Sequence, residues 1–411
     1  MAEPFVADPD FTLYVGDVRA VIAQLPDESV DCVVTSPPYW GLRDYGHDGQ
    51  IGLEQSPDCL GWATGDECGE CFVCSLVGVF RDLRRVLVAH GTCWLNLGDT
   101  YASKARGSDE GWATSRLTNP ASQQKVQAAA LRKDGQRHRG KLAGLKEKDL
   151  AGIPWRVALA LQADGWWLRS DVIWSKPNVM PESTTDRPTK AHEYVFLLAK
   201  SPRYYFDRDA VREPHSGQAS GNVERFFPPA GHSIQNVHLG RSIPWAQSSV
   251  GRNVRTVWEI ATQPYKGAHF AVFPPRLAER CVLAGCPPEV CTVCGKPRVR
   301  IVEKGDPVVP DHTWSATGAA RYDDEEGDYV AAGGASTLKH VVPRETVGWT
   351  DCGHDAFRAG VVLDPFMGSG TTALVARAAR RHAIGIEINP TYADLCARRL
   401  SQQSLLTENA A

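Results

Sequence analysis

The sequence predicts an α/β fold with an open, mostly parallel sheet, and three features of the chain indicate it. The short run Val30–Thr35 is mostly apolar, which is typical of a strand buried on both faces of a parallel sheet. The run ends at Ser36-Pro37-Pro38-Tyr39, and consecutive prolines cannot continue a central strand, so this motif lies just beyond the carboxyl end. Near the C-terminus, a strand, a glycine-bearing loop, a helix and a second strand follow one another. Open α/β sheets bind their ligands at the carboxyl ends of such strands.

The other elements follow from hydrophobic periodicity and from turn residues. Apolar runs bounded by Gly, Asp or Pro predict strands at Thr12–Asp17, Thr92–Leu97, Trp167–Trp174, Glu193–Ala199, Val361–Asp364 and Ala383–Glu387. Apolar residues at helical spacing predict helices at Val18–Leu25, Leu76–Leu87, Pro154–Asp164, Pro274–Ala284, Thr371–Arg381 and Pro390–Leu400.

The composition is that of a globular chain. Of 411 residues, 43% are hydrophobic and 23% are charged, which suffices for one large domain with insertions or for two domains. A formal net charge of −3 excludes a uniformly basic nucleic-acid coat, so any contact with nucleic acid must come from local patches. No apolar run approaches the ~20 residues of a membrane span, and residues 1–10 do not resemble a secretory signal. We therefore expect a cytoplasmic protein without membrane contact.

The 12 cysteines divide into isolated and clustered residues. Five stand singly in apolar or helical surroundings and are expected to be buried, inert thiols: Cys32, Cys93, Cys281, Cys286 and Cys396. The other seven form two clusters: Cys59, Cys68, Cys71 and Cys74, then Cys291, Cys294 and Cys352. In an intracellular chain such clusters favour metal ligation over disulfides.

The C-terminal loop reads Asp364-Pro365-Phe366-Met367-Gly368-Ser369-Gly370-Thr371-Thr372. Its glycines permit a tight turn and close approach of the backbone to a ligand, and the helix N-terminus that follows favours negative charge. Glu387, at the end of the next strand, could accept from both hydroxyls of a ribose. The loop lacks the Lys of a Walker A phosphate site, which argues against an NTPase. A glycine-rich turn alone is also compatible with a purely structural role.

The Ser36-Pro37-Pro38-Tyr39 motif brings together two hydrogen-bond acceptors and an aromatic ring. An exocyclic –NH2 group could donate to the Ser36 hydroxyl and to the Pro37 carbonyl while its flat ring stacks on Tyr39. These contacts draw the amine hydrogens out of conjugation, which makes the nitrogen nucleophilic. The alternative is a strand terminator followed by a core aromatic residue.

Together, the Ser-Pro-Pro-Tyr motif and the later Asp-Pro-Phe-Met-Gly-Ser-Gly-Thr-Thr loop resemble the DNA amino-methyltransferases, which methylate N4 of cytosine or N6 of adenine. Because the target-amine motif comes first and the S-adenosylmethionine loop lies near the C-terminus, the chain resembles the circularly permuted beta group of that family. Matching blocks extend from about residue 12 to residue 400, with gaps at the insertions. The resemblance implies a Rossmann-like S-adenosylmethionine-dependent methyltransferase fold.

The resemblance also implies roles for individual residues. The residues matching the cofactor loop are Asp364, Phe366, Gly368 and Gly370, with Thr371 opening the helix. Glu387 matches the acid on the cofactor ribose, and Asp17 matches an acid near the cofactor adenine. Phe270 and Phe273 lie in a segment that resembles the one closing over the methionine end.

On the substrate side, the motif of Ser36, Pro37, Pro38 and Tyr39 matches the residues that hold the extruded base. Lys176-Pro177-Asn178 and the stretch 187–193 resemble later motifs of the family beside that base. In this family Ser at the first position is usual for N4-cytosine enzymes and Asp for adenine enzymes. We therefore expect base flipping and direct methyl transfer from S-adenosylmethionine to cytosine N4 in duplex DNA, without a cysteine nucleophile.

Both cysteine clusters have features of structural zinc sites. Cys291 and Cys294, closed by Cys352 and His354, supply three thiolates and an imidazole, which suits tetrahedral zinc in a ribbon inserted at 286–354. Cys59, Cys68, Cys71 and Cys74 supply four thiolates for a second zinc ion, although their spacing is tighter than in a pair of knuckles.

Two polar stretches have separate interpretations. Residues 104–148 carry eleven Lys or Arg against four acids, a net +7, and are expected to be an insertion that contacts phosphates or is merely solvated. Residues 200–265 lie where the family carries its target-recognition region. The side chains there that are able to read base edges are Arg225, Asn236, His238, Arg241, Gln247, Arg252, Asn253 and Arg255.

The predicted organisation is therefore a catalytic domain in two parts, 1–199 and 266–411, that flank the recognition region 200–265. The alternatives are an N6-adenine enzyme and, less favoured, a zinc-ribbon nucleic-acid binding protein with an inactive methyltransferase core. No nuclease motif is evident, so a restriction endonuclease would be a separate chain, in a bacterial or phage setting. The protein would act as a monomer or a homodimer.

Overall fold

The structure is a computed structural model that describes residues 3–42, 44, 46–102, 145–213, 246–248, 251–263, 273–305 and 340–408. Its internal contacts divide the chain into two units. The larger unit comprises Met1–Asp207, Thr256–Arg298 and Gly353–Ala411, and the smaller one comprises Arg208–Arg255 and Val299–Cys352. The smaller unit thus joins most of the predicted recognition region to part of the predicted ribbon insertion.

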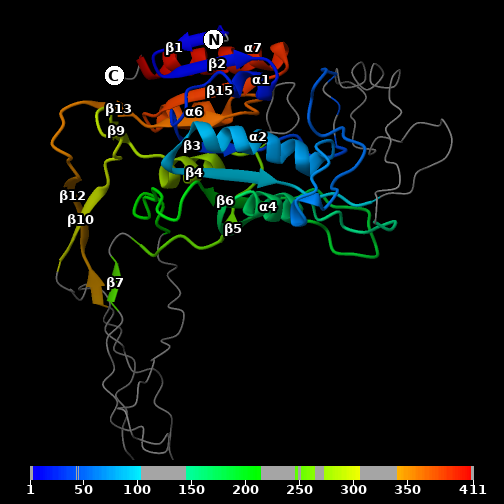
Figure 1. Cartoon of the computed structure of the whole chain (residues 1–411). Coiled ribbons are helices and arrows are strands. Elements are labelled where there is room, and N and C mark those ends of the chain that lie inside the picture. The colour runs from blue at the N-terminus through cyan, green and yellow to red at the C-terminus, as the bar shows by residue number, and fades with distance from the viewer. Residues whose placement is uncertain are drawn as a thin grey trace, which may run out of the picture. The chain divides into compact units, whose positions relative to one another are not determined.

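The larger unit is built on a nine-stranded sheet (Figure 1) in the order β1-β2-β15-β14-β3-β4-β6-β5-β8. In chain order its strands are β1 (Val6–Asp8), β2 (Phe11–Val15), β3 (Val30–Thr35), β4 (Leu87–Leu97), β5 (Trp167–Ser175), β6 (His192–Ala199), β8 (Val257–Glu259), β14 (Val361–Asp364) and β15 (His382–Glu387). All six residues of β3 are buried, as expected for a strand in the middle of such a sheet.

Five neighbouring strands, β2, β15, β14, β3 and β4, run parallel. Their carboxyl ends therefore meet at one edge of the sheet. The chain leaves β3 toward β4 on one side and leaves β14 toward β15 on the other, so the strand order reverses between β3 and β14. This is the topological switch point, where open α/β sheets bind ligands.

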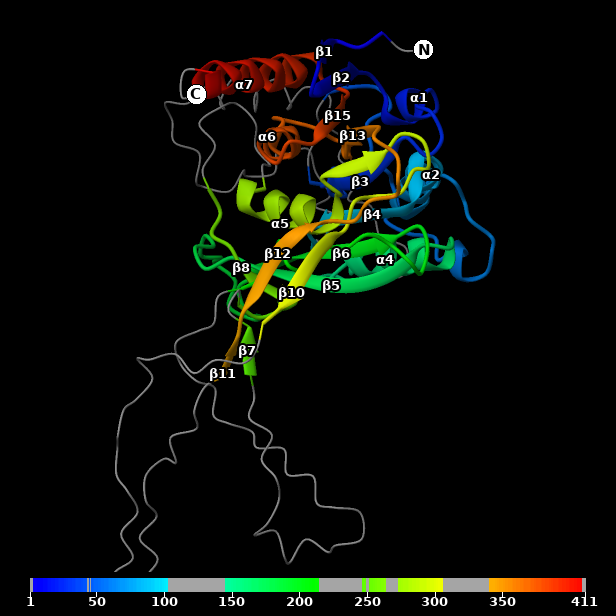
Figure 2. The ribbon, with the colours of Figure 1, turned by 90° about the vertical axis from the view of Figure 1, so that its left-hand side faces the viewer.

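Helices cover both faces of the sheet (Figure 2). One layer contains α1 (Val18–Ile22), α2 (Phe72–Val86) and α4 (Ile153–Ala163), and the other contains α5 (Pro275–Gly285), α6 (Thr371–Ala378) and α7 (Pro390–Glu408). Within each layer the helices pack on one another, α2 against α1 and α4, and α5 against α6. No helix among the described residues has the length and apolar character needed to cross a membrane.

Short elements complete the two units. In the larger unit, a 3-10 turn, η1 (Gly61–Ala63), lies in the first cysteine segment, and β9 (Glu289–Cys291) pairs with β13 (Phe357–Ala359). In the smaller unit, β10 (Arg300–Lys304) pairs antiparallel with β12 (Arg344–Trp349), and β7 (Ala246–Ser248) pairs with β11 (His340–Val342). The Asp209 carboxylate of that unit accepts hydrogen bonds from Arg212 and Arg344, 2.5 and 3.2 Å away.

The predicted α/β class is confirmed, and so is the burial of all five isolated cysteines. Burial raises the pKa of these thiols, that of Cys396 to about 12, so they stay protonated at neutral pH.

Candidate active site and cysteine clusters

A cavity of about 420 Å³ lies at the switch point of the larger unit. One wall is the motif Ser36, Pro37, Pro38 and Tyr39. The opposite wall is the loop 365–369 with Thr371 and Glu387. Two motifs more than 300 residues apart in the chain therefore line one cavity, and its volume is in the usual range for a small-molecule site.

The carboxylate of Asp364 joins these two walls. It is 1% exposed, and its two oxygens accept hydrogen bonds from the hydroxyls of Thr35 (2.8 Å) and Thr372 (2.6 Å). The backbone N–H of Phe366 donates a third, at 3.1 Å. Burial raises the pKa of Asp364 to about 6, and the three donors partly offset this effect. Asp364 thus fastens the end of β3, next to Ser36, to the glycine loop and to α6, and is not itself among the residues that line the cavity.

The glycine loop turns tightly before α6. Gly368 and Gly370 have φ values of 53° and 82°, a left-handed conformation that favours glycine. A Cβ atom on Gly370 would lie 2.5 Å from the Cys396 sulfur, so α7 also requires a glycine there. The loop places the Gly368 N–H 2.8 Å from the Glu387 carboxylate.

Glu387 ends β15 inside the cavity. It is 7% exposed, and its carboxylate accepts from the backbone N–H groups of Gly368 and Asn389, the latter at 2.9 Å. Burial raises the pKa of Glu387 to about 7 in spite of these two donors. Each carboxylate oxygen keeps a further lone pair for a ligand hydroxyl.

The Tyr39 side chain belongs to a polar network at the cavity wall. Its hydroxyl donates to the Glu193 carboxylate at 2.7 Å, and it lies 3.4 Å from the Ser36 hydroxyl and 3.3 Å from the Asn96 side-chain oxygen. Lys176 forms an ion pair with the other oxygen of Glu193. All five side chains line the cavity.

The structure separates the predicted cofactor residues into two groups. Phe273, Phe366, Gly368, Thr371 and Glu387 line the cavity, whereas Asp364 and Gly370 shape the loop behind it. Asp17 caps α1 and forms an ion pair with Arg19, whose Nε lies 2.9 Å from the Asp17 carboxylate. The residues on either side of Asp17, Gly16 and Val18, line the cavity. Phe270 lies outside the described residues.

Sequence reasoning missed Asn96, Trp174, Thr262 and Tyr392 of the cavity lining. Asn96 lies at the carboxyl end of β4, so its position at the ligand edge of a parallel strand was the available signal. Trp174 and Thr262 reach the cavity through the pairing of β5 with β8, which joins distant parts of the chain. No sequence signal that we recognise indicates that pairing.

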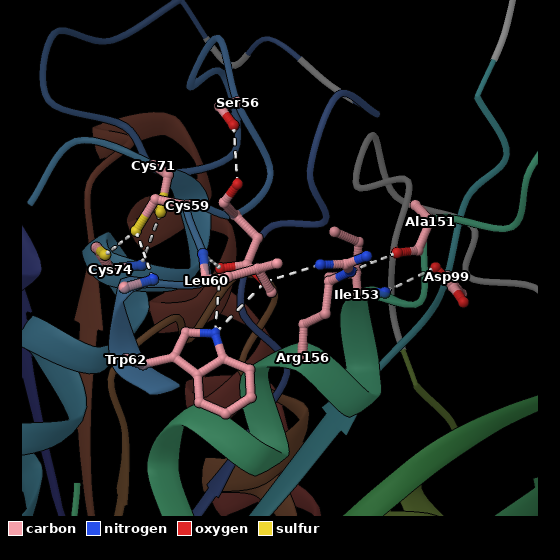
Figure 3. A network of polar contacts seen from close by, with 12 residues as sticks. Ser56, Cys59, Leu60, Trp62, Cys71, Cys74, Asp99, Ala151, Ile153 and Arg156 are labelled. Carbon is pink, nitrogen blue, oxygen red and sulfur yellow. Dashed lines mark hydrogen bonds and ion pairs between the residues drawn. The ribbon is translucent and has the colours of Figure 1, made fainter. Parts of the chain in front are cut away.

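The first cysteine cluster extends from just before η1 into the first turn of α2, and Figure 3 labels three of its members, Cys59, Cys71 and Cys74. The four sulfurs of Cys59, Cys68, Cys71 and Cys74 all lie within 4.8 Å of one another. The Cys59–Cys74 and Cys68–Cys74 sulfur distances are 3.6 and 3.9 Å. A tetrahedron with metal–sulfur bonds of ~2.3 Å has edges of ~3.8 Å. Four backbone N–H groups, those of Gly61, Glu70, Cys71 and Cys74, donate to these sulfurs.

Polar contacts connect this cluster to α4 (Figure 3). The buried Asp58 carboxylate accepts from the Leu60 N–H at 2.8 Å, the Trp62 indole at 3.2 Å and Arg156 at 2.9 Å. Arg156 in turn donates to the Ala151 carbonyl, and Asp99 accepts from the Ile153 N–H at the start of α4. The segment that carries the cysteines is thereby fastened to the end of β4 beside the cavity.

The second cluster lies at the pairing of β9 with β13. The Cys291 sulfur is 3.5 Å from His354 Nδ1, and the N–H groups of Val293 and Cys294 approach the same sulfur at 3.4 and 3.5 Å. The ligand atoms of Cys291, Cys294, Cys352 and His354 lie within 4.8 Å of one another. Both clusters thus offer four donor groups at metal-binding separations.

Most of the predicted DNA-reading region lies outside the described residues. Arg225, Asn236, His238 and Arg241 belong to that part, as does most of the insertion 104–148, and the Gln247 side chain is not described. Arg252 and Arg255 both pair with the Glu213 carboxylate, at 3.2 and 2.9 Å. These two arginines therefore help to hold the smaller unit together.

Comparison with known proteins identifies the family of this chain. The family model described as DNA methylase, which covers N6 and N4 enzymes, matches residues 30–293 and 355–398. The chain belongs to this DNA methylase family. Its relatives include the Type II methyltransferases M.Cfr9I of Citrobacter freundii (38% identical, 95% of this chain and 87% of the relative) and M.SmaI of Serratia marcescens (36%, 94% and 90%). M.ScaI of Streptomyces caespitosus is 51% identical over 98% of this chain and 86% of its own.

This DNA methylase also resembles solved structures at low identity. The PvuII DNA methyltransferase, titled cytosine-N4-specific, matches with a TM-score of 0.48 at 15% identity, covering 96% of this chain and 88% of that one. The family match confirms the expected DNA amino-methyltransferase.

Proposed function

We propose that this DNA methylase transfers the methyl group of S-adenosylmethionine to the exocyclic N4 amine of a cytosine that is flipped out of duplex DNA. The observation that carries the proposal is the single cavity, which is lined on one wall by Ser36–Tyr39 and on the other by the glycine loop and Glu387.

The loop wall fits S-adenosylmethionine. Glu387 is buried, lines the cavity and retains acceptor capacity for the two ribose hydroxyls. The aromatic rings of Phe273, Phe366 and Tyr392 line the same space, and the glycines allow the backbone to approach the ligand. When bound, this cofactor supplies an activated methyl group on a sulfonium.

The opposite wall fits an aromatic amine. The Ser36 hydroxyl and the Pro37 carbonyl accept the two amine hydrogens, which localises the lone pair on nitrogen. With the cofactor bound, the new N–C bond would form as the C–S bond breaks, and the electron pair of the C–S bond would go to sulfur. The amine then loses one proton to solvent.

Two features favour cytosine over adenine. Ser36 supplies a neutral hydroxyl at the position where adenine enzymes of the family usually carry a carboxylate. Cytosine presents N3 and O2 as adjacent acceptors beside its amine, whereas adenine presents only N1 there, and the Lys176 ammonium is a donor in the same cavity.

We further propose that each cysteine cluster holds one structural zinc ion. Four ligands at tetrahedral separations, with N–H groups donating to sulfur, leave no open position for a catalytic water. The recognition region 200–265 would read the DNA sequence, and the insertion 104–148 would contact phosphates. No nuclease motif is evident in the sequence, so a companion endonuclease would be a separate chain, and the enzyme would work in the cytoplasm as a monomer or homodimer.

The experiment is transfer of a labelled methyl group to duplex DNA, followed by digestion and mass analysis of the nucleosides. N4-methylcytosine supports the proposal. If N6-methyladenine is found, the mechanism stands and the target base is adenine. If no nucleoside is labelled in any DNA, including genomic DNA, the proposed activity is contradicted. The variant Ser36→Ala should lose the label, and Ser29→Ala, at a half-buried serine outside the cavity, is the matched control.

A further inference from the structure

The cavity wall contains a carboxylate that the proposed reaction does not use. Glu193, at the start of β6, has a side chain 17% exposed, and its partner Lys176, just after β5, has one 16% exposed. The Lys176 ammonium also lies 4.3 Å from the centre of the Trp174 ring. An ion pair this far removed from water is costly to assemble unless its oxygens are well supplied with donors.

The Glu193 carboxylate has three donors. One oxygen accepts from the Tyr39 hydroxyl at 2.7 Å and from the Asn96 amide at 3.2 Å, and the other accepts from Lys176. The Asn96 amide donates its second hydrogen to the Tyr194 carbonyl at 3.1 Å, which fixes its orientation. Asn96 therefore presents its oxygen, and not its NH2 group, toward Tyr39.

The single hydroxyl hydrogen of Tyr39 determines which group donates in each hydrogen bond between Ser36, Tyr39 and Glu193. Burial, and next to it the charge of Glu193, raises the pKa of Tyr39 well above its usual value, so the hydroxyl keeps its single proton. That proton goes to Glu193, the nearest acceptor and a charged one. Toward Ser36, 3.4 Å away, the Tyr39 oxygen can only accept, so the hydrogen between these two hydroxyls belongs to Ser36.

Because Ser36 donates its hydroxyl hydrogen to Tyr39, the Ser36 oxygen offers only lone pairs to the cavity. We propose that Glu193 is a positioning residue that acts through Tyr39 to fix Ser36 as a hydrogen-bond acceptor for the target amine. This inference rests on the proposed function. It explains how a neutral serine can accept from the target amine where other members of the family use a carboxylate: the negative charge lies on Glu193 and acts through the Tyr39 hydroxyl.

The position of the Tyr39 ring is also set by its close contact with Gly98. A Cβ atom on Gly98 would come within 2.5 Å of that ring, so the glycine leaves room for the ring beside the end of β4. The hydroxyl is thereby kept within reach of Glu193 and Ser36 together.

The central test is Glu193→Gln. The glutamine amide can donate to Tyr39, which turns the Tyr39 proton toward Ser36 and makes Ser36 face a competing donor. We expect kcat to fall at least about tenfold, less than the ~10²–10⁴-fold of a group that transfers the proton itself, because Glu193 acts through Tyr39. The Kd for S-adenosylmethionine should be unchanged. Asp164→Asn removes a carboxylate of similar burial that pairs with Arg81 outside the cavity, and should change neither quantity.

Two further variants separate positioning from support of the fold. Tyr39→Phe keeps the Lys176–Glu193 ion pair and removes only the hydroxyl that connects Glu193 to Ser36, so it should lower kcat to a similar extent. Adding Glu193→Gln to Tyr39→Phe should lower kcat little further. Adding Ser36→Asp to Glu193→Gln supplies an acceptor that needs no relay and should restore part of the lost rate.

The outcomes distinguish this inference from the proposed function. If the wild-type enzyme methylates DNA and Glu193→Gln is equally active, Glu193 has no positioning role. If the losses in Glu193→Gln and Tyr39→Phe multiply and Ser36→Asp restores nothing, the two residues act separately and the relay is wrong. A wild-type enzyme without any transfer would instead contradict the proposed function.

Discussion

Glu387 is a buried acid that must be ionised to accept from two ribose hydroxyls. Burial raises its pKa to about 7, whereas an exposed glutamate titrates at 4.5. Between these two values the folded chain holds a proton that the unfolded chain has lost. The contribution of this group to stability in the cofactor-free protein therefore decreases as the pH rises through that window, because the unfolded state binds fewer protons.

Binding of S-adenosylmethionine should show the opposite trend. Because binding requires the ionised form, we expect the affinity to increase about tenfold between pH 6 and pH 8, as the ionised fraction rises through a pKa of about 7. Titration calorimetry at several pH values measures this directly. Glu387→Gln should bind weakly with no such pH dependence, and an equally steep dependence in that variant would assign the titration to another group.

Asp364 has a structural role that its place in the loop motif did not suggest. Replacing it with alanine leaves the Thr35 hydroxyl and the Phe366 N–H without their acceptor, and leaves the Thr372 hydroxyl only the Val34 carbonyl at 3.3 Å. Each unsatisfied buried group costs about 1–3 kcal/mol, so Asp364→Ala should lower the free energy of unfolding by about 2–5 kcal/mol. Chemical denaturation checks this, with Asp8→Ala in the exposed edge strand as the control. A loss below about 1 kcal/mol would mean that Asp364 does not hold the two walls together.

At the scale of elements, the first cysteine cluster lies in a segment with little regular secondary structure. The segment before α2 contains no strand or α-helix in its described residues and is held by the cluster and by the Asp58 contacts. A metal ion bound only by the folded chain adds its binding free energy to stability.

Elemental analysis should therefore find two zinc ions per chain. Cys71→Ser and Cys291→Ser should each lose one ion and lower the melting temperature, because a ligand is missing from a closed tetrahedral site. Cys281→Ala, at a buried and isolated thiol, should keep both ions. Metal-free protein with an unchanged melting temperature would refute both zinc assignments.

Several elements could be predicted because local pattern alone determines them. β3 has the predicted bounds because an apolar run is closed by two prolines. By contrast α2 begins at Phe72, four residues earlier than predicted, since Cys71 caps it and Phe72 and Val73 are buried. α6 ends three residues earlier than predicted, and Arg380 just beyond it has a φ of 57°, outside the helical range.

At the scale of the whole molecule, the sequence predicted which motifs form the site and could not predict what connects them. The two walls were recognisable because each motif lies at a strand end. Their link through Thr35 and Asp364, and the network from Tyr39 to Glu193, join residues 329 and 154 positions apart. Likewise β7 pairs with β11 within the smaller unit, whereas the sequence predicted two separate insertions there. Such pairings depend on tertiary packing, which hydrophobic periodicity does not reveal.

The proposed reaction requires the two walls of one cavity to act separately: the loop wall holds the methyl donor and the Ser36–Tyr39 wall holds the base. The most direct measurement compares S-adenosylmethionine binding with methyl transfer in Ser36→Ala and Tyr39→Ala, using variants whose melting temperatures match the wild type. We predict that both bind the cofactor within about twofold of the wild type while transfer to DNA falls at least about a hundredfold, as expected when groups that act on the reacting atom are removed. Loss of cofactor binding in both folded variants, or transfer at the wild-type rate, would contradict the assignment of the two walls.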